Sequence, residues 1–329
     1  MFSICFKVLC TCSLSCALMT SNALTVPNHT LSYVAQRGTS VSSSNYEQTR
    51  LSLLLGDKGY SLPEIDILHA HLSPDCMESL LNRPYDELIV KIAAQPHFHE
   101  SQLDQYLDYG HANPQYSPED LVTRVNMGMD DPFYHNPQLI QNPESIDVLV
   151  NKYYTLGADY VPELVKMAAA YANSSNSYMH PEAYAWFVKM ADAARAQGLQ
   201  LRSVSAYRSY ASQKSIYQRY VNEYGTSSAD IYSARPGHSE HQTGLAVDIN
   251  VARRTAHFEN TQHYQWLSEN SWKYGFILRY PQNKRSITGF IFEPWHYRYV
   301  GLELAKSIYE SGLTLEEYLA SRPATQSVS

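Results

Sequence analysis

Residues 239–250 carry the pattern on which the fold prediction depends: Ser239-Glu240-His241-Gln242-Thr243-Gly244-Leu245-Ala246-Val247-Asp248-Ile249-Asn250. From Leu245 onward, large apolar side chains alternate with small or polar ones, which is typical of a β-strand with one face against a core. His241 and Asp248 are an odd number of positions apart, so a flat strand would direct them to opposite faces. Gly244 can supply the bend that lets both side chains converge.

A second segment, Glu293-Pro294-Trp295-His296, carries an acid and an imidazole about 50 residues later. Pro294 interrupts strand pairing, so Glu293 can lie off the regular strand that carries His296. His241, Asp248 and His296 form a three-ligand set for zinc that leaves a fourth position for water. Glu293 is then the spare carboxylate that can take a proton from that water. Either segment alone is also compatible with a structural hydrogen bond.

The surrounding sequence predicts strands mixed irregularly with helices, an α+β class with a mostly antiparallel sheet flanked by helices. His180-Pro181-Glu182 begins the first helical range given below and Gly198 follows it, and Gly225 ends the second. Alternation of apolar and polar residues marks strands such as 201–207 and 245–250. The predicted helices are 180–196, 212–224, 260–274, 302–309 and 315–320, and the predicted strands are 201–207, 245–250, 276–279 and 289–300.

A small helical section is predicted ahead of this region, within residues 47–144. Two of its helix starts are clear, because Ser61-Leu62-Pro63-Glu64 and Ser117-Pro118-Glu119 place a capping hydroxyl before an early proline. Residues 24–46 are rich in Ser, Thr, Val and Asn and read as a linker. Residues 323–329 read as a tail.

Composition narrows the class of protein further. The 329-residue chain is long enough for about two structural units and has a net charge of -7. An acidic balance without Lys/Arg clusters argues against a nucleic-acid partner.

Residues 1–23 resemble a secretory signal, with Lys7, an apolar stretch and a small-residue end at Ala23. An uncleaved membrane anchor is the alternative. Four of the five cysteines lie in this segment, leaving only Cys76 beyond it.

Three motifs in order resemble the zinc-dependent D-alanyl-D-alanine carboxypeptidases of the VanY type, which trim bacterial peptidoglycan stem peptides. Ser239 to Asp248 matches Ser-x-His-x-x-Gly-x-Ala-x-Asp, and Glu293 to His296 matches Glu-x-x-His. Tyr207-Arg208-Ser209, followed by Gln213, matches a third element. The resemblance spans about residues 115–320 and includes Leu149-Val150-Asn151-Lys152-Tyr153-Tyr154, which is similar to the segment preceding the catalytic core.

The resemblance implies one zinc ion per chain and a role for each matching residue. His241, Asp248 and His296 would be the zinc ligands, and Glu293 the catalytic carboxylate. Arg208 would bind the substrate, and its planar guanidinium suits a free carboxylate. Ser239 and Gln213 would hydrogen-bond the substrate or orient the ligands. The domain organisation expected on this basis is a signal peptide (1–23), a linker (24–46), a helical section (47–144), a zinc carboxypeptidase domain (145–322) and a tail.

The expected function is removal of the C-terminal D-alanine from peptidoglycan stem peptides by an exported enzyme in the cell wall or at the outer face of the cytoplasmic membrane. Three alternatives stay open. The first is an L,D-carboxypeptidase that cuts tetrapeptide stems, and the second is a D,D-dipeptidase that cuts free D-Ala-D-Ala. The third is a cell-wall-binding protein without catalysis. The sequence leaves the oligomeric state open.

Overall fold

A computed structural model of the chain describes residues 43–251 and 255–322. The predicted signal, most of the predicted linker and the tail lie outside these residues. The chain divides into two compact units, Met1–Leu51 and Ser52–Ser329. Helix α2 (Ser43–Asp57) spans this boundary, so residues 43–46 are helical and do not belong to a linker as predicted. Of the helices in the described residues, none is long and apolar enough to cross a membrane.

Short helices with capped starts fill the first part of the second unit. Ser61 and Ser117 precede two of these helices, each with a proline in the first turn, as predicted. The Ser117 hydroxyl accepts a hydrogen bond from the backbone N–H of Asp120, which satisfies a donor that a helix start leaves unpaired. The helices are α3 (Leu62–His71), α4 (Pro74–Leu80), α5 (Glu87–Ala93), η1 (Glu100–Gln102), α6 (Leu103–Ala112) and α7 (Pro118–Asn126).

The helical part ends at Asn126, well before the predicted boundary at residue 144. The next segment forms strand β1 (Gln138–Leu139), which pairs in parallel with β2 (Tyr154–Thr155). Two further short strands, β3 (Val165–Lys166) and β4 (Tyr178–Met179), form an antiparallel pair.

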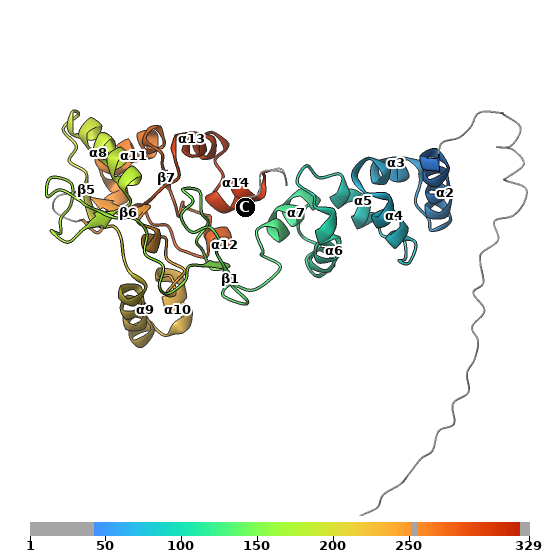
Figure 1. Ribbon diagram of the computed structural model, residues 1–329, viewed down its shortest axis with the longest axis horizontal. Coiled ribbons are helices and arrows are strands. Elements are labelled where there is room, and N and C mark those ends of the chain that lie inside the picture. The colour runs from blue at the N-terminus through green and yellow to red at the C-terminus, as the bar shows by residue number, and fades with distance from the viewer. Residues whose placement is uncertain (1–42, 252–254, 323–329) are drawn as a thin grey trace, which may run out of the picture. The chain divides into compact units, whose positions relative to one another are not determined.

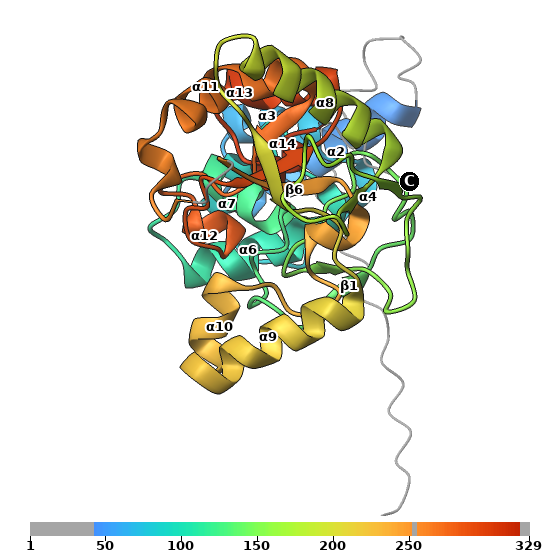
Figure 2. The same cartoon turned by 90° about the vertical axis from the view of Figure 1, so that its left-hand side faces the viewer.

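A four-stranded antiparallel sheet organises the C-terminal part. Its strand order is β5 (Arg202–Ser205), β6 (Ala246–Asn250), β8 (His296–Tyr299) and β7 (Phe276–Leu278). Figures 1 and 2 both show α8 (Pro181–Arg195) and α11 (Gln262–Asn270) on one side of this sheet. Helix α13 (Leu302–Ser311) packs on Ile277 of β7. The same views show α9 (Tyr210–Tyr224) and α10 (Thr226–Tyr232) on the other side. The remaining elements are η2 (Glu240–Thr243), η3 (Phe258–Asn260), η4 (Ser271–Tyr274), α12 (Arg285–Thr288) and α14 (Leu315–Ala320).

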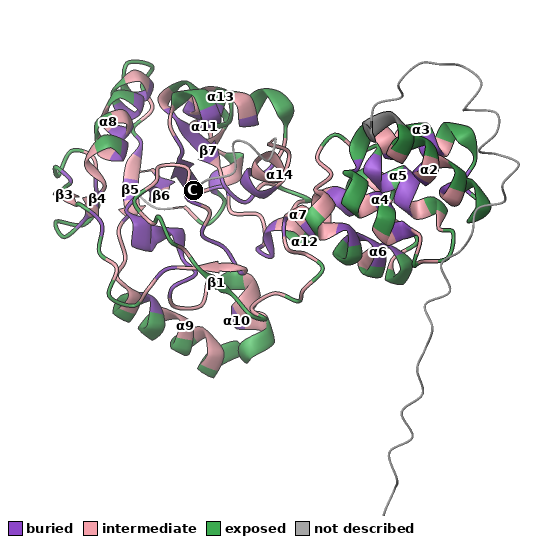
Figure 3. Ribbon diagram, turned by 45° about the vertical axis from the view of Figure 1, so that its right-hand side comes forward, coloured by how far each residue is buried: buried purple, intermediate pink, exposed green. Residues whose placement is uncertain are grey.

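One face of β6 packs in the core and the other faces a cavity, as the alternation of its residues predicts. Val247 and Ile249 are fully buried in the main core with Phe187 of α8. Asp248 and Asn250 point the other way and line a cavity. Figure 3 shows the buried colour concentrated on the central strands. The period of two residues therefore separates the core of this region from its site.

The α+β class and the mostly antiparallel sheet are confirmed, and the predicted elements are found with small shifts at most ends. Two ranges are wrong. Residues 289–295 are not part of a strand, because Gly289 has a φ of 78° and Pro294 has no N–H to donate. The predicted helix 260–274 begins at Gln262 and ends as the tighter η4 from Ser271.

Candidate active site

Three predicted metal ligands come from three different elements and meet at one point. His241 lies on η2, Asp248 on β6 and His296 on β8. Asp248 and His296 are paired across the sheet. Oδ1 of Asp248 lies 3.4 Å from Nε2 of His241 and 3.3 Å from Nδ1 of His296. One ligand atom from each residue lies within 4.8 Å of the others.

The bend at Gly244 makes this convergence possible. Gly244 has a φ of 70° in the left-handed region, which ends η2 and starts the strand. A Cβ here would lie 3.0 Å from the backbone nitrogen of His180. His241 therefore does not lie on the strand of Asp248, and the odd spacing no longer separates the two side chains.

The residues fit a zinc ion. Oδ1 of Asp248 is buried and has no hydrogen-bond partner among the described residues, a costly arrangement unless a cation binds there. Two imidazoles and one carboxylate are the donor set of many catalytic zinc sites. Each imidazole also has an outer partner that fixes the nitrogen it offers to a metal. Nδ1 of His241 lies 2.7 Å from the carbonyl oxygen of Ala206, which leaves Nε2 for the metal.

Glu240 is the outer partner of His296, and sequence reasoning missed it. Its Oε2 lies 3.4 Å from Nε2 of His296, so Nδ1 of His296 faces Asp248. Arg279 and Arg298 donate to Oε1 of Glu240 at 2.7 and 2.8 Å. Burial alone would raise the pKa of Glu240, but the two guanidinium groups hold it well below its usual range. Glu316 also accepts hydrogen bonds from Arg279, so two buried acids balance two buried bases.

Glu293 lies in the loop before β8 and beside the ligands. Its N–H donates to the carbonyl oxygen of Tyr280 at 3.1 Å, and its Oε2 lies 3.5 Å from Nδ1 of His296. Burial raises the pKa of Glu293 to about 7, against a smaller opposing effect of His296. A carboxyl group with a pKa near neutrality is suited to accept and return a proton.

Arg208 faces the same cavity from the segment after β5. One of its nitrogens, Nη2, lies 3.8 Å from Oδ2 of Asp248 and donates to Ser205 at 2.9 Å. The other, Nη1, donates to Oε1 of Gln213 at 2.7 Å. The guanidinium is therefore held in a fixed orientation next to the ligand set.

Gln213 is 1% exposed, and both the oxygen and the nitrogen of its side-chain amide form hydrogen bonds. Besides accepting from Arg208, it donates to the Ser233 hydroxyl and to the Ala234 carbonyl. This geometry favours the orienting role of the two roles expected for Gln213. Ser239 also lines the cavity, at the start of η2.

The cavity that joins these groups has a volume of about 780 Å³. Its wall also includes Tyr280, whose ring centre lies 4.9 Å from that of His296. Tyr280 was not singled out from the sequence, since no motif contains it. The cavity is lined further by Val204, Ser205, Ile216, Arg219, Tyr220, Tyr232, Ser233, Ala234, Asn250, Thr255, Ala256, Phe290 and Trp295.

The His–Asp–His set, the carboxyl group of Glu293 and the guanidinium of Arg208 line one cavity, and the comparisons place the chain among the carboxypeptidases. Residues 176–302 match the family model described as VanY, D-alanyl-D-alanine carboxypeptidase. The chain belongs to this family, as the relatives below also show.

Two curated relatives and one solved structure illustrate the similarity. A D-alanyl-D-alanine carboxypeptidase of Enterococcus faecalis is 41% identical over 181 residues, which are 52% of this chain and 65% of that protein. The bifunctional D-Ala-D-Ala dipeptidase and D-Ala-D-Ala carboxypeptidase VanXYC of Enterococcus gallinarum is 34% identical over 52% of this chain and 91% of its own length. The structure of the LD-carboxypeptidase LdcB shares 43% identity with a TM-score of 0.53, over 55% of this chain and 89% of that one.

Proposed function

We propose that this protein is an exported zinc carboxypeptidase that removes the C-terminal D-alanine from peptidoglycan stem peptides. The observation that carries the proposal is the buried Oδ1 of Asp248, which lies between His241 and His296 and has no hydrogen-bond partner among the described residues, with Glu293 alongside. Export is proposed from the signal-like residues 1–23, which lie outside the described residues. The substrate is proposed from the relatives, whose names specify D-Ala-D-Ala.

The side chains of this site can divide the reaction between them. A zinc ion held by His241, Asp248 and His296 would supply a Lewis acid for the scissile carbonyl and lower the pKa of a water molecule. Glu293 accepts a proton as water oxygen bonds to the carbonyl carbon. It returns the proton to the amine as the carbon–nitrogen bond breaks. Arg208 binds the terminal carboxylate, which marks the chain end for an exopeptidase.

An L,D-carboxypeptidase is the second candidate, and the likeness to LdcB favours it. The D,D and L,D activities differ in the stereocentre at the penultimate residue. A D,D-dipeptidase is a third candidate, because VanXYC combines that activity with carboxypeptidase activity. The three candidates use the same site and the same mechanism and differ in their substrate. An assay that compares substrates therefore separates them.

The test is zinc content of the full chain together with D-alanine release from pentapeptide stems, tetrapeptide stems and free D-Ala-D-Ala. One zinc per chain and fastest release from the pentapeptide would support the main proposal. Faster release from the tetrapeptide would support the L,D alternative. Zinc and cell-wall binding with no release from any of the three would favour a non-catalytic wall-binding protein.

A further inference from the structure

Lys152 is a buried lysine that the proposed mechanism does not use. It lies just before β2 and is 3% exposed, which is rare for a lysine without compensating partners. It also lies outside residues 176–302, the part of the chain that matches the family model. Burial lowers its pKa to about 8, so the ammonium keeps its proton at neutral pH.

Two backbone carbonyls and three aromatic rings surround the ammonium. Nζ donates to the carbonyl oxygens of Asp230 and Gly289, both at 2.7 Å. The ring centres of Phe290, Phe133 and Tyr134 lie 4.4, 4.8 and 5.3 Å from Nζ. Rings at these distances attract a cation through their electron-rich faces, and the carbonyls satisfy its N–H groups.

The fit between Lys152 and Gly289 is close. Gly289 has a φ of 78°, and a Cβ at this position would lie 2.6–2.8 Å from the last three atoms of the Lys152 side chain. A side chain at residue 289 would therefore push the ammonium away from the carbonyl that it binds. The missing side chain is what permits the contact.

The two carbonyls belong to two chain segments that each continue into residues lining the active-site cavity. Asp230 lies in α10, two to four residues before Tyr232, Ser233 and Ala234, which line the cavity. Ser233 and Ala234 accept the hydrogen bonds of Gln213, the residue that orients Arg208. One wall therefore runs from Lys152 to the proposed carboxylate anchor.

The other wall runs from Gly289 towards the proposed metal site. Phe290 lines the cavity and packs on Tyr280, with ring centres 4.9 Å apart. Tyr280 in turn packs on His296. The same loop continues to Glu293.

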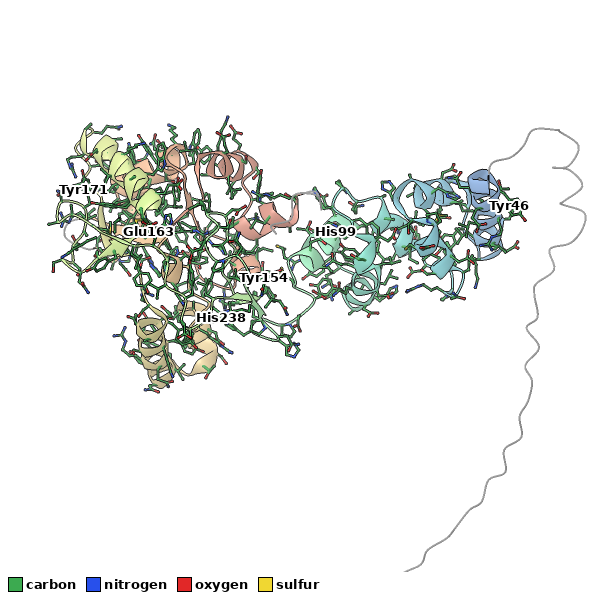
Figure 4. The ribbon with its side chains drawn as sticks, viewed as in Figure 1. Tyr46, His99, Tyr154, Glu163, Tyr171 and His238 are labelled. Atoms are coloured by element: carbon green, nitrogen blue, oxygen red, sulfur yellow. The ribbon has the colours of Figure 1, made fainter. Side chains whose placement is uncertain are left out.

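A neighbouring contact anchors Lys152 itself. Nδ1 of His238 lies 2.7 Å from the carbonyl oxygen of Asn151, and the side chain of Asn151 accepts hydrogen bonds from the N–H groups of Tyr153 and Tyr154. Tyr154 and His238, both labelled in Figure 4, mark the two chain segments that meet here. The backbone around Lys152 is therefore fixed on both sides.

We propose that Lys152 is a positioning residue for the substrate cavity: by binding the carbonyls of Asp230 and Gly289, it sets the spacing between the wall that orients Arg208 and the loop that carries Glu293. This inference rests on the proposed function. If Lys152 has this role, the segment before residues 176–302 contributes to the geometry of the active site.

The test compares Lys152→Met, which keeps the length and removes the ammonium, with Lys166→Met, an exposed lysine on β3 that does not line the cavity. Zinc content, kcat and KM are measured for each full-length variant on the stem peptide that the wild type cuts best. We expect Lys152→Met to bind one zinc and to lose about 10- to 100-fold in kcat/KM, the scale of a small misplacement of reacting groups. Lys166→Met should match the wild type.

A double-mutant cycle with Arg208→Ala separates positioning from general destabilisation. If Lys152 acts through the orientation of Arg208, Lys152→Met should cost at most about threefold more in the Arg208→Ala background, because the group that it positions is gone. Equal losses in both backgrounds would overturn the inference. So would unchanged kcat/KM with only a lower melting temperature.

A milder variant covers the case in which Lys152→Met does not fold. Phe133→Leu removes one ring from around the ammonium and touches neither the cavity nor the two hydrogen bonds. It should show a smaller fall in kcat/KM with the same dependence on Arg208, and unchanged kcat/KM would count against the inference. A wild type that releases no D-alanine would overturn the proposed function, and with it this inference. An active wild type with insensitive variants would overturn the inference alone.

Discussion

Asp248 and His296 lie opposite each other on β6 and β8, with Oδ1 of the carboxylate 3.3 Å from Nδ1 of the imidazole. Strand pairing fixes this contact, so the register of the sheet sets the geometry of two candidate ligands at once. A one-residue shift of β8 would turn His296 to the other face of the sheet. The relative position of these two side chains therefore depends on the pairing of β6 and β8.

Glu293→Ala should keep the zinc and lose turnover. Glu293 is not among the three ligand residues, but it is the nearby carboxyl group with a pKa of about 7. We expect kcat to fall by about 10²- to 10⁴-fold, the usual contribution of a general base. The measurement is D-alanine release together with zinc content.

Glu163→Ala is the matched control for that experiment, since Glu163 is exposed and does not line the cavity. It is labelled in Figure 4. Full activity is expected of it. Loss of zinc from Glu293→Ala would instead identify Glu293 as a ligand.

Arg208→Ala should impair substrates with a free terminal carboxylate more than amidated ones. A hydrogen bond to a charged group has a net contribution of about 1.5–3 kcal/mol, so we expect at least about a tenfold fall in kcat/KM for the free acid. The ratio of kcat/KM for the acid over the amide should move towards one. Equal losses on both substrates would contradict an anchor role.

Gln213→Ala tests whether Gln213 orients the guanidinium group of Arg208. It removes the acceptor of Arg208 at 2.7 Å but leaves the guanidinium in place. We expect the acid-over-amide ratio to fall in the same direction and by less. An unchanged ratio would show that Gln213 does not orient Arg208.

The sequence predicts that His241, Asp248 and His296 converge, because the information for this is local. The spacing of His241, Gly244 and Asp248 and the proline beside Glu293 are each contained within a few residues, and the structure brings these side chains together as expected. The domain boundaries depend on how far a helical pattern extends, which is a weaker signal.

Glu240 and Lys152 could not be found in the same way. Glu240 stands inside the first motif, but its partners Arg279 and Arg298 follow 39 and 58 residues later. Lys152 binds backbone carbonyl oxygens 78 and 137 residues away. Every residue has such a carbonyl, so the sequence does not show which ones a lysine will bind. Their roles come from the tertiary packing of distant segments.

Zinc binding should release protons at neutral pH. Burial alone lowers the pKa of His296, but its contacts with Asp248 and Glu240 raise it to about 9 in the metal-free protein. A metal binds the neutral imidazole, so below pH 9 zinc must displace this proton. The apparent zinc affinity should therefore weaken about fivefold from pH 9 to pH 8 and close to tenfold from pH 8 to pH 7.

Isothermal titration of zinc in two buffers of different ionisation enthalpy measures this release directly. At pH 7 we expect at least one proton per zinc for the wild type. A zinc affinity that does not change between pH 7 and 9 would show that His296 is already neutral. His296→Ala should lose most of the zinc affinity.

Glu240→Gln should weaken both the fold and the metal site. The substitution keeps the size of the side chain but removes a charge that two buried arginines share, and breaking such a pair typically costs about 3–5 kcal/mol. Loss of an outer partner of a ligand histidine lowers metal affinity by about 10- to 100-fold. Denaturant unfolding of the metal-free protein and a competitive zinc titration measure the two effects separately.

Glu87→Gln is the control, because Glu87 pairs with Lys91 at the surface and such pairs contribute at most about 1 kcal/mol. A Glu240→Gln variant that is destabilised but binds zinc as the wild type does would assign Glu240 to the fold alone. Weaker zinc binding without destabilisation would assign it to His296 alone. We expect both effects together, because the same carboxylate contacts His296 and accepts hydrogen bonds from Arg279, just after β7, and from Arg298 on β8.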